Sequence, residues 1–185
     1  MKKDIILCGV GGQGILSIAT VIGEAAVRAG LFIKQAEVHG MSQRGGDVQS
    51  HLRLSTEPVW SDLIPRGEAD IIISMEPMEA LRYLPCLSKD GAVVTASSPF
   101  VNIPDYPPME ALDAEYDRLP NAVRVDIEST ARESGNPKGA NMALLGAAAP
   151  YLEILSPEQL GDAVKEVFSS KGDAVVEANL KTLGL

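Results

Sequence analysis

A short apolar run, a cluster of glycines and a long apolar stretch open the chain, and together they constrain its fold more than any other feature. Residues 5–10 form a continuous apolar run, which is typical of a strand buried on both faces of a sheet. Gly9, Gly11 and Gly14 then give the spacing G-x-G-x-x-G. The stretch from there to Ala29 has apolar residues at helical spacing, and Gly30 suits its end. This order predicts a strand, a tight turn and a helix.

The rest of the chain repeats the alternation of strands and helices. Further strands are predicted at 32–38, 47–55, 69–74, 92–96 and 123–127, and further helices at 77–87, 109–119 and 141–149, from Ser156 onward and at 173–183. Such alternation favours an α/β fold. We expect a Rossmann-like three-layer sandwich with a mostly parallel sheet. Residues 1–185 are predicted to form one domain, with an irregular proline-rich segment at 97–108.

Composition excludes several classes of function. Sixteen basic and 25 acidic side chains give a net charge of −9, which argues against binding to nucleic acid or to an anionic membrane surface. No apolar run is long enough to cross a bilayer. Cys8 and Cys86 are the only cysteines, too few for a disulfide scaffold, a four-cysteine zinc site or a self-contained iron–sulfur cluster. A reducing cytoplasm suits two free thiols best.

The first glycine loop leaves two interpretations open. Its candidate cofactor-binding residues are Gly9, Gly11, Gly12, Gln13 and Gly14. In a dinucleotide site the glycines allow close approach of the pyrophosphate to a helix N-terminus. Glu37, 23 positions after Gly14, would then accept the ribose hydroxyls. A purely structural turn requires glycine equally. A Walker A loop is excluded, because no Lys-Ser or Lys-Thr follows Gly14.

A second glycine-rich segment, residues 37–46, joins two predicted strands where a nucleotide-binding fold commonly has a helix. Arg44 next to two glycines could present its guanidinium and backbone N–H groups to a phosphate or carboxylate. Alternatively, Arg44 and Arg53 pair with local carboxylates. His39 and His51 are the only histidines and lack a neighbouring cluster of cysteines and carboxylates, so a structural or interface role is favoured. We therefore predict no catalytic residue and no metal site on this chain.

These two segments also carry a family resemblance. The sequences CGVGGQG at 8–14, EVHGMSQRGG at 37–46 and SHLR at 50–53 resemble the gamma-type subunits of 2-oxoacid:ferredoxin oxidoreductases, in particular the small (beta) subunits of indolepyruvate ferredoxin oxidoreductases. Matches at 76–85, 141–146 and 176–180 extend the similarity along the whole chain. The combination of two glycine segments is far more specific than G-x-G-x-x-G alone.

The resemblance implies a gamma-type domain that serves as a non-catalytic subunit. The complex would oxidatively decarboxylate a 2-oxoacid, in particular an aryl pyruvate such as indolepyruvate, to an acyl-CoA. Thiamine diphosphate and [4Fe-4S] clusters would be on the larger partner chain, through which ferredoxin is reduced, and coenzyme A would join the complex. The residues expected to contact the partner or coenzyme A are His39, Ser42, Gln43, Arg44, Gly45 and Gly46. The weakly polar side of the first helix is expected at the same contact.

The sequence is also compatible with two other functions. A free-standing NAD(P)-binding Rossmann-type oxidoreductase would need an acid–base residue that the sequence does not supply. A nucleotide-binding or assembly module without an enzymatic role would have a partner other than a thiamine enzyme. The sequence leaves open which 2-oxoacid is used, the stoichiometry of the complex and whether the isolated chain forms a homodimer.

Overall fold

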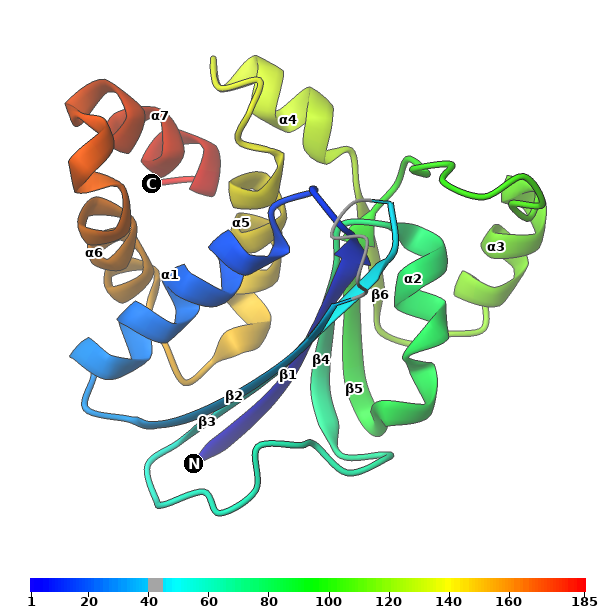
Figure 1. The fold of residues 1–185 in the computed structure, drawn as a ribbon, viewed down its shortest axis with the longest axis horizontal. Coiled ribbons are helices and arrows are strands. Elements are labelled where there is room, and N and C mark those ends of the chain that lie inside the picture. The colour runs from blue at the N-terminus through cyan, green and yellow to red at the C-terminus, as the bar shows by residue number, and fades with distance from the viewer. Residues whose placement is uncertain (40–44) are drawn as a thin grey trace.

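The computed structural model describes residues 1–39 and 45–185 and contains one six-stranded sheet (Figure 1). Its strands are β1 (Lys2–Val10), β2 (Phe32–His39), β3 (Asp47–Ser55), β4 (Ala69–Ser74), β5 (Leu87–Ala96) and β6 (Ala122–Val125), in the order β2-β3-β1-β4-β5-β6. Among these strands only β3 runs against the others, since it is antiparallel to both β1 and β2. The predicted α/β fold with a mostly parallel sheet is confirmed; the reversed β3 was not predicted.

Helices cover both faces of the sheet and give the predicted three layers. The helices are α1 (Ile15–Arg28), α2 (Pro77–Arg82), α3 (Met109–Tyr116), α4 (Ile127–Glu133), α5 (Ala140–Leu152), α6 (Pro157–Phe168) and α7 (Asp173–Leu183). Figure 1 shows α1, α5, α6 and α7 on one side of the sheet and α2 and α3 on the other. Within the described ranges, no helix is both long and apolar enough to span a membrane.

The apolar run of β1 supplies both cores. Ile5 and Leu7 pack into the core beneath α1 and α5, whereas Ile6 and Cys8 face the smaller core beneath α2, and all four are fully buried. Successive strand side chains point to opposite faces, so a central strand covered on both sides must be apolar throughout. Each fully buried Ile or Leu contributes about 1.5–3 kcal/mol. This strand therefore anchors both layers of helices.

The helix predicted at 77–87 is shorter than the sequence indicated. Helix α2 ends at Arg82, and a 3-10 turn follows at Leu84–Cys86. Pro85 lacks a backbone N–H and its ring obstructs a continuing α-helix. Strand β5 then begins at Leu87, earlier than predicted, and its pairing with β4 has an irregularity before Ala92.

A short helix was also missed where a strand was predicted at 123–127. Strand β6 ends at Val125, and Asp126 accepts a hydrogen bond from the backbone N–H of Ser129 at 2.9 Å. An aspartate in this position satisfies one of the free N–H groups at a helix start. Helix α4 therefore begins at Ile127, and Asp126 is the only residue between the strand and the helix.

A buried ion pair crosses the antiparallel half of the sheet. Arg53 on β3 lies opposite Asp4 on β1, and its Nε and Nη2 donate to the two carboxylate oxygens at 2.8 and 3.0 Å. Asp4 is fully buried and Arg53 is 8% exposed. The bidentate geometry compensates two charges that have lost most of their water. The interpretation of Arg53 as the partner of a local carboxylate is confirmed.

Replacing Arg53 with alanine is expected to lower the free energy of unfolding by about 3 kcal/mol, because it removes the buried bidentate partner of Asp4 and leaves that carboxylate only the half-exposed Lys2, 2.8 Å away. Urea unfolding followed by circular dichroism measures this change. Arg118→Ala is the matched control, since Arg118 pairs with Glu115 on the surface and the pair is worth at most about 1 kcal/mol. Equal effects of the two substitutions would contradict the buried pair.

His51 lies two residues before Arg53 and has a structural role. Its Nδ1 accepts a hydrogen bond from the backbone N–H of Ile64 at 3.0 Å, which requires that nitrogen to be unprotonated. Burial lowers the pKa of His51 below its ordinary value, and the nearby positive charge of Arg53 lowers it further. The folded protein therefore favours the neutral imidazole.

This lowered pKa predicts a specific dependence of stability on pH. Below about pH 6.5 the unfolded chain takes up a proton on His51 before the folded chain does, so stability falls as the pH is lowered through the depressed pKa. His51→Asn keeps an acceptor but does not titrate, and its unfolding free energy should change less between pH 7 and pH 5.5. Parallel pH profiles for the two proteins would contradict the assignment.

Candidate functional site

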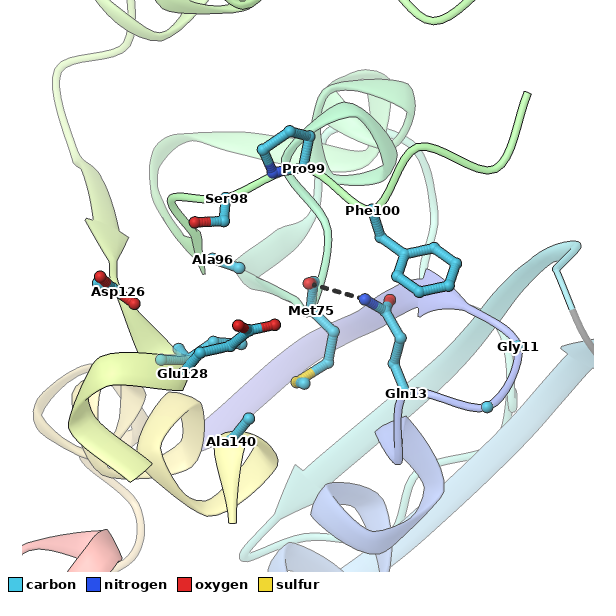
Figure 2. Close-up of a pocket in the computed structure, with 12 residues that line it drawn as sticks. Gly11, Gln13, Met75, Ala96, Ser98, Pro99, Phe100, Asp126, Glu128 and Ala140 are labelled. Atoms are coloured by element: carbon cyan, nitrogen blue, oxygen red, sulfur yellow. Dashed lines mark hydrogen bonds between the residues drawn. The ribbon is translucent and has the colours of Figure 1, made fainter. Parts of the chain in front are cut away.

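Four parallel strands end at the same side of the sheet, and the loops that follow them line an open crevice of about 350 Å³ (Figure 2). Its lining residues are Gly11, Gly12 and Gln13 after β1, Met75 after β4, Ala96, Ser98, Pro99 and Phe100 at and after the end of β5, Asp126, Ile127 and Glu128 after β6, and Ala140 on α5. Strand β1 lies at the point where the strand order changes direction, with β3 and β2 on one side of it and β4 on the other. Ligands of open α/β sheets commonly bind in such a crevice.

Gln13 joins the ends of two strands at this crevice. Its side-chain Oε1 accepts the backbone N–H of Val10 at 2.7 Å, and its Nε2 donates to the carbonyl oxygen of Met75 at 3.2 Å. Figure 2 shows this amide between Met75 and the ring of Phe100. The side chain therefore fixes the floor of the crevice between β1 and β4.

Two glycines of the first loop are required by its backbone. Gly12 and Gly14 have φ values of 101° and 88°, in the left-handed region that residues with a Cβ rarely adopt. A Cβ on Gly14 would also lie 2.9 Å from the Nδ2 of Asn141, which donates to the Gly14 carbonyl oxygen at 3.3 Å. The tight turn alone accounts for glycine at these positions.

The two glycine segments predicted from the sequence are hydrogen-bonded to each other. The N–H of Gly11 donates to the carbonyl oxygen of Gly46 at 2.8 Å, and the N–H of Gly45 donates to the carbonyl oxygen of Gly11 at 3.3 Å. We call this pair of bonds the glycine bridge. It continues the β1–β3 ladder beyond its last pair, Val10 and Asp47. Asn102 adds a third segment, since its Nδ2 donates to the Gly45 carbonyl oxygen at 2.9 Å.

The other residues predicted to contact a partner are only partly described. The backbone of His39 is the last of β2 and pairs with Val48 on β3. Ser42, Gln43 and Arg44 lie outside the described residues. The structure thus brings the first glycine loop next to Gly45 and Gly46.

A buried carboxylate that the sequence did not single out holds one wall of the crevice. Glu76 is fully buried, and its Oε2 accepts the N–H of Glu79 at 2.8 Å. Its Oε1 accepts the N–H of Phe100 at 3.3 Å and the hydroxyl of Tyr106. Burial raises the pKa of Tyr106, and the hydrogen bond to the carboxylate raises it further. Three donors thus compensate the buried charge, and the two from Phe100 and Tyr106 fix the proline-rich segment beside the crevice.

Two carboxylates give one side of the crevice an acidic rim. Asp126 and Glu128 line it after β6, and Figure 2 shows the Glu128 carboxylate directed towards Met75. Two carboxylates repel a phosphate group placed between them and the first glycine loop. The rim therefore disfavours a pyrophosphate in this position.

Glu37 does not reach the first glycine loop. It lies on β2, the edge strand, and β3 separates β2 from β1. Neighbouring strands are about 4.8 Å apart, so Glu37 is displaced from β1 by about 10 Å across the sheet. Its carboxylate accepts a hydrogen bond from Gln35 at 2.6 Å. Glu37 is therefore not placed to make the predicted ribose contact beside the first glycine loop.

The two thiols differ in their surroundings. Cys8 is fully buried, and burial raises the pKa of its thiol, whereas Cys86 is partly exposed in the turn after α2. In the part of the chain that the structure describes, no three His, Cys, Asp or Glu side chains are grouped so that they could hold a metal ion.

The glycine turn gives a direct test of these assignments. Gly14→Ala is expected to lower the free energy of unfolding by about 2 kcal/mol, because it combines left-handed backbone strain with a close contact to Asn141. Gly12→Ala is the matched control: its Cβ would meet nothing within 4 Å, so only strain of about 1 kcal/mol remains. Thermal unfolding measures both, and a larger loss for Gly12→Ala would contradict the contact.

Comparisons with known proteins agree with the resemblance seen in the sequence. The chain is 35% identical to the indolepyruvate oxidoreductase subunit IorB of Archaeoglobus fulgidus over 99% of its own length and 92% of the relative's. It is 39% identical to the same subunit of Thermococcus kodakarensis, covering 89% of this chain and 86% of the relative.

Solved structures show the same fold. The gamma subunit of a keto/oxoacid ferredoxin oxidoreductase from Geobacter sulfurreducens matches with a TM-score of 0.69 at 24% identity, over 98% of this chain and 94% of that one. A 2-oxoglutarate:ferredoxin oxidoreductase from Magnetococcus marinus matches with a TM-score of 0.77 at 22% identity. It contains this fold within a longer chain, since the match covers 99% of this chain but 30% of that one. The model of one family, pyruvate ferredoxin/flavodoxin oxidoreductase, matches residues 4–185, and the chain belongs to that family.

Proposed function

We propose that this chain is the small, non-catalytic subunit of an indolepyruvate-type 2-oxoacid:ferredoxin oxidoreductase. One comparison within a single organism carries the substrate class. Two relatives come from Methanothermobacter thermautotrophicus. The chain is 38% identical to the indolepyruvate oxidoreductase subunit IorB of that organism and 29% identical to its 2-oxoglutarate synthase subunit KorC. The alignments cover 94% and 85% of those relatives, so the difference applies to nearly the whole subunit.

In this proposal the chemistry belongs to the complex. The larger partner chain holds thiamine diphosphate and the [4Fe-4S] clusters, decarboxylates the aryl pyruvate, passes electrons to ferredoxin and forms the acyl-CoA. This chain would contribute one gamma-type domain, residues 1–185, because all six strands belong to one sheet and both cores pack against it. Two free thiols suit a cytoplasmic complex.

We further propose that the edge of the sheet carrying the glycine bridge faces the partner. Exposed apolar side chains border this edge: Leu16 at the start of α1 is 45% exposed, and Phe100 and Val101 are 48% and 66% exposed. Phe100 and Val101 are adjacent in the chain, and contiguous exposed apolar surface marks interaction sites. The contacts assigned to His39, Ser42, Gln43, Arg44, Gly45 and Gly46, with the partner or with coenzyme A, belong to this proposal.

The NAD(P)-dependent alternative is not favoured. Glu37 is two strands from β1, the N–H of Gly11 already donates to Gly46, and carboxylates line the crevice. We therefore expect isothermal titration of the isolated chain with NAD or NADP to give no saturable binding up to millimolar concentration. Saturable binding in the micromolar range would instead support the dehydrogenase function.

Reconstitution tests the proposed function itself. The isolated chain should have no 2-oxoacid oxidoreductase activity, and ferredoxin reduction with indolepyruvate and coenzyme A should appear when it is combined with its large subunit. The large subunit alone should be much less active. Failure of the wild-type chain to bind a thiamine- and iron–sulfur-containing subunit, or full activity of that subunit alone, would contradict the proposal.

A further inference from the structure

The loop between β3 and β4, residues 56–68, exposes the only tryptophan of the chain. Trp60 is 91% exposed and Leu63 is 56% exposed. Because β3 runs against β1, this loop lies at the end of the sheet opposite the crevice, below the strands in Figure 1. The two exposed apolar side chains are therefore separate from the edge that carries the glycine bridge.

Buried side chains of β3 fix the loop that carries Trp60. The Nη1 of Arg53 donates to the carbonyl oxygens of Ser61 at 3.2 Å and Leu63 at 3.0 Å. The backbone N–H of Ile64 donates to His51 at 3.0 Å, and the Ile64 side chain is 5% exposed in the smaller core. The same guanidinium that compensates Asp4 thus also orders the residues next to Trp60.

Such ordering has a consequence for binding. A loop that is already held in one conformation loses little further entropy when it meets a partner. Tryptophan is enriched among the residues that dominate the affinity of protein interfaces, especially when it enters a pocket on the other chain. Because Trp60 is almost fully exposed on a fixed loop, burial of its indole in a partner would contribute strongly to the free energy of binding.

We propose that the Trp60 loop, residues 56–68, is a second docking surface for the large subunit, on which Trp60 enters an apolar pocket with a basic rim. The proposal rests on the proposed function and names a further contact of the same assembly. It assigns the binding energy at this end of the sheet chiefly to Trp60 and Leu63. Arg53 and His51 act as positioning residues beneath them.

Charge selects the partner over a second copy of this chain. The loop carries Glu57, Asp62 and Glu68 against one basic residue, Arg66, and the whole chain has a net charge of −9. Lys34 on β2 pairs with Asp62 at 3.3 Å, so Glu57 and Glu68 supply most of the acidic character of the loop. A symmetric dimer through this loop would place the same acidic residues of two copies against each other, which is unfavourable. A pocket bordered by lysine or arginine side chains complements the loop in both polarity and charge.

The single tryptophan makes the contact directly observable. The full chain labelled with 5-fluorotryptophan gives one ¹⁹F resonance, from Trp60, which is titrated with the unlabelled large subunit. We expect the resonance to shift or broaden on binding. We also expect Trp60→Ala to weaken the complex by at least about 30-fold, as for a dominant interface residue, with the melting temperature unchanged. Val175→Ala on α7, where Val175 is 37% exposed, is the control and should change the affinity less than threefold.

Each contrary outcome has a distinct meaning. A wild-type complex that forms without a change in the ¹⁹F resonance, or that Trp60→Ala weakens by less than about 30-fold, overturns this inference and leaves the proposed function intact. A homodimer that Trp60→Ala dissociates overturns it in favour of self-association. If the wild-type chain binds no large subunit at all, the proposed function and this inference fail together.

Discussion

The glycine bridge is the constraint on which the crevice depends. Strand β3 is hydrogen-bonded along the whole of β1, and the exchange between Gly11 and Gly45–Gly46 carries that pairing past the ends of both strands. It occupies backbone groups that a phosphate-binding loop would offer to its ligand. Because β3 lies between β1 and β2, β2 is the outermost strand of the sheet, and Glu37 lies on it, away from β1. The direction of β3 thus sets both the pairing of the first glycine loop and the distance of Glu37 from it.

The opposite wall of the crevice depends on a buried charge. Glu76 lies at the start of α2, where its carboxylate caps the helix, and the same group accepts hydrogen bonds from Phe100 and Tyr106. A segment with four prolines forms few regular backbone hydrogen bonds of its own, so an internal acceptor determines its position. Together with Gln13 and the glycine bridge, this gives a fixed surface at the carboxyl end of the sheet. Such a surface suits docking on a partner that performs the chemistry.

Local patterns predicted the elements well, and tertiary pairing accounts for what they missed. The run at 5–10, the apolar helix after Gly14 and the last helix at Asp173–Leu183 follow from periodicity and from glycine positions. The direction of β3 could not be inferred, because alternation of Val48, Ser50, Leu52 and Leu54 is the same in parallel and antiparallel strands. The glycine bridge joins residues 34 or more positions apart in the sequence, and Glu76 is hydrogen-bonded to a residue 30 positions away. Local sequence patterns therefore could not predict either contact. The motif spacing predicted the turn, whereas the pairing of Gly11 with Gly46 depends on β3 and could not be read from it.

The most direct measurement is the hydrogen exchange of the Gly11 amide in the isolated chain, followed by NMR with and without NAD. If the glycine bridge forms in solution, the Gly11 amide is protected to a degree similar to the amides of β1, and NAD leaves its exchange unchanged. Rapid exchange in the free chain, followed by protection when NAD is added, would show a loop open to a dinucleotide and would contradict the account.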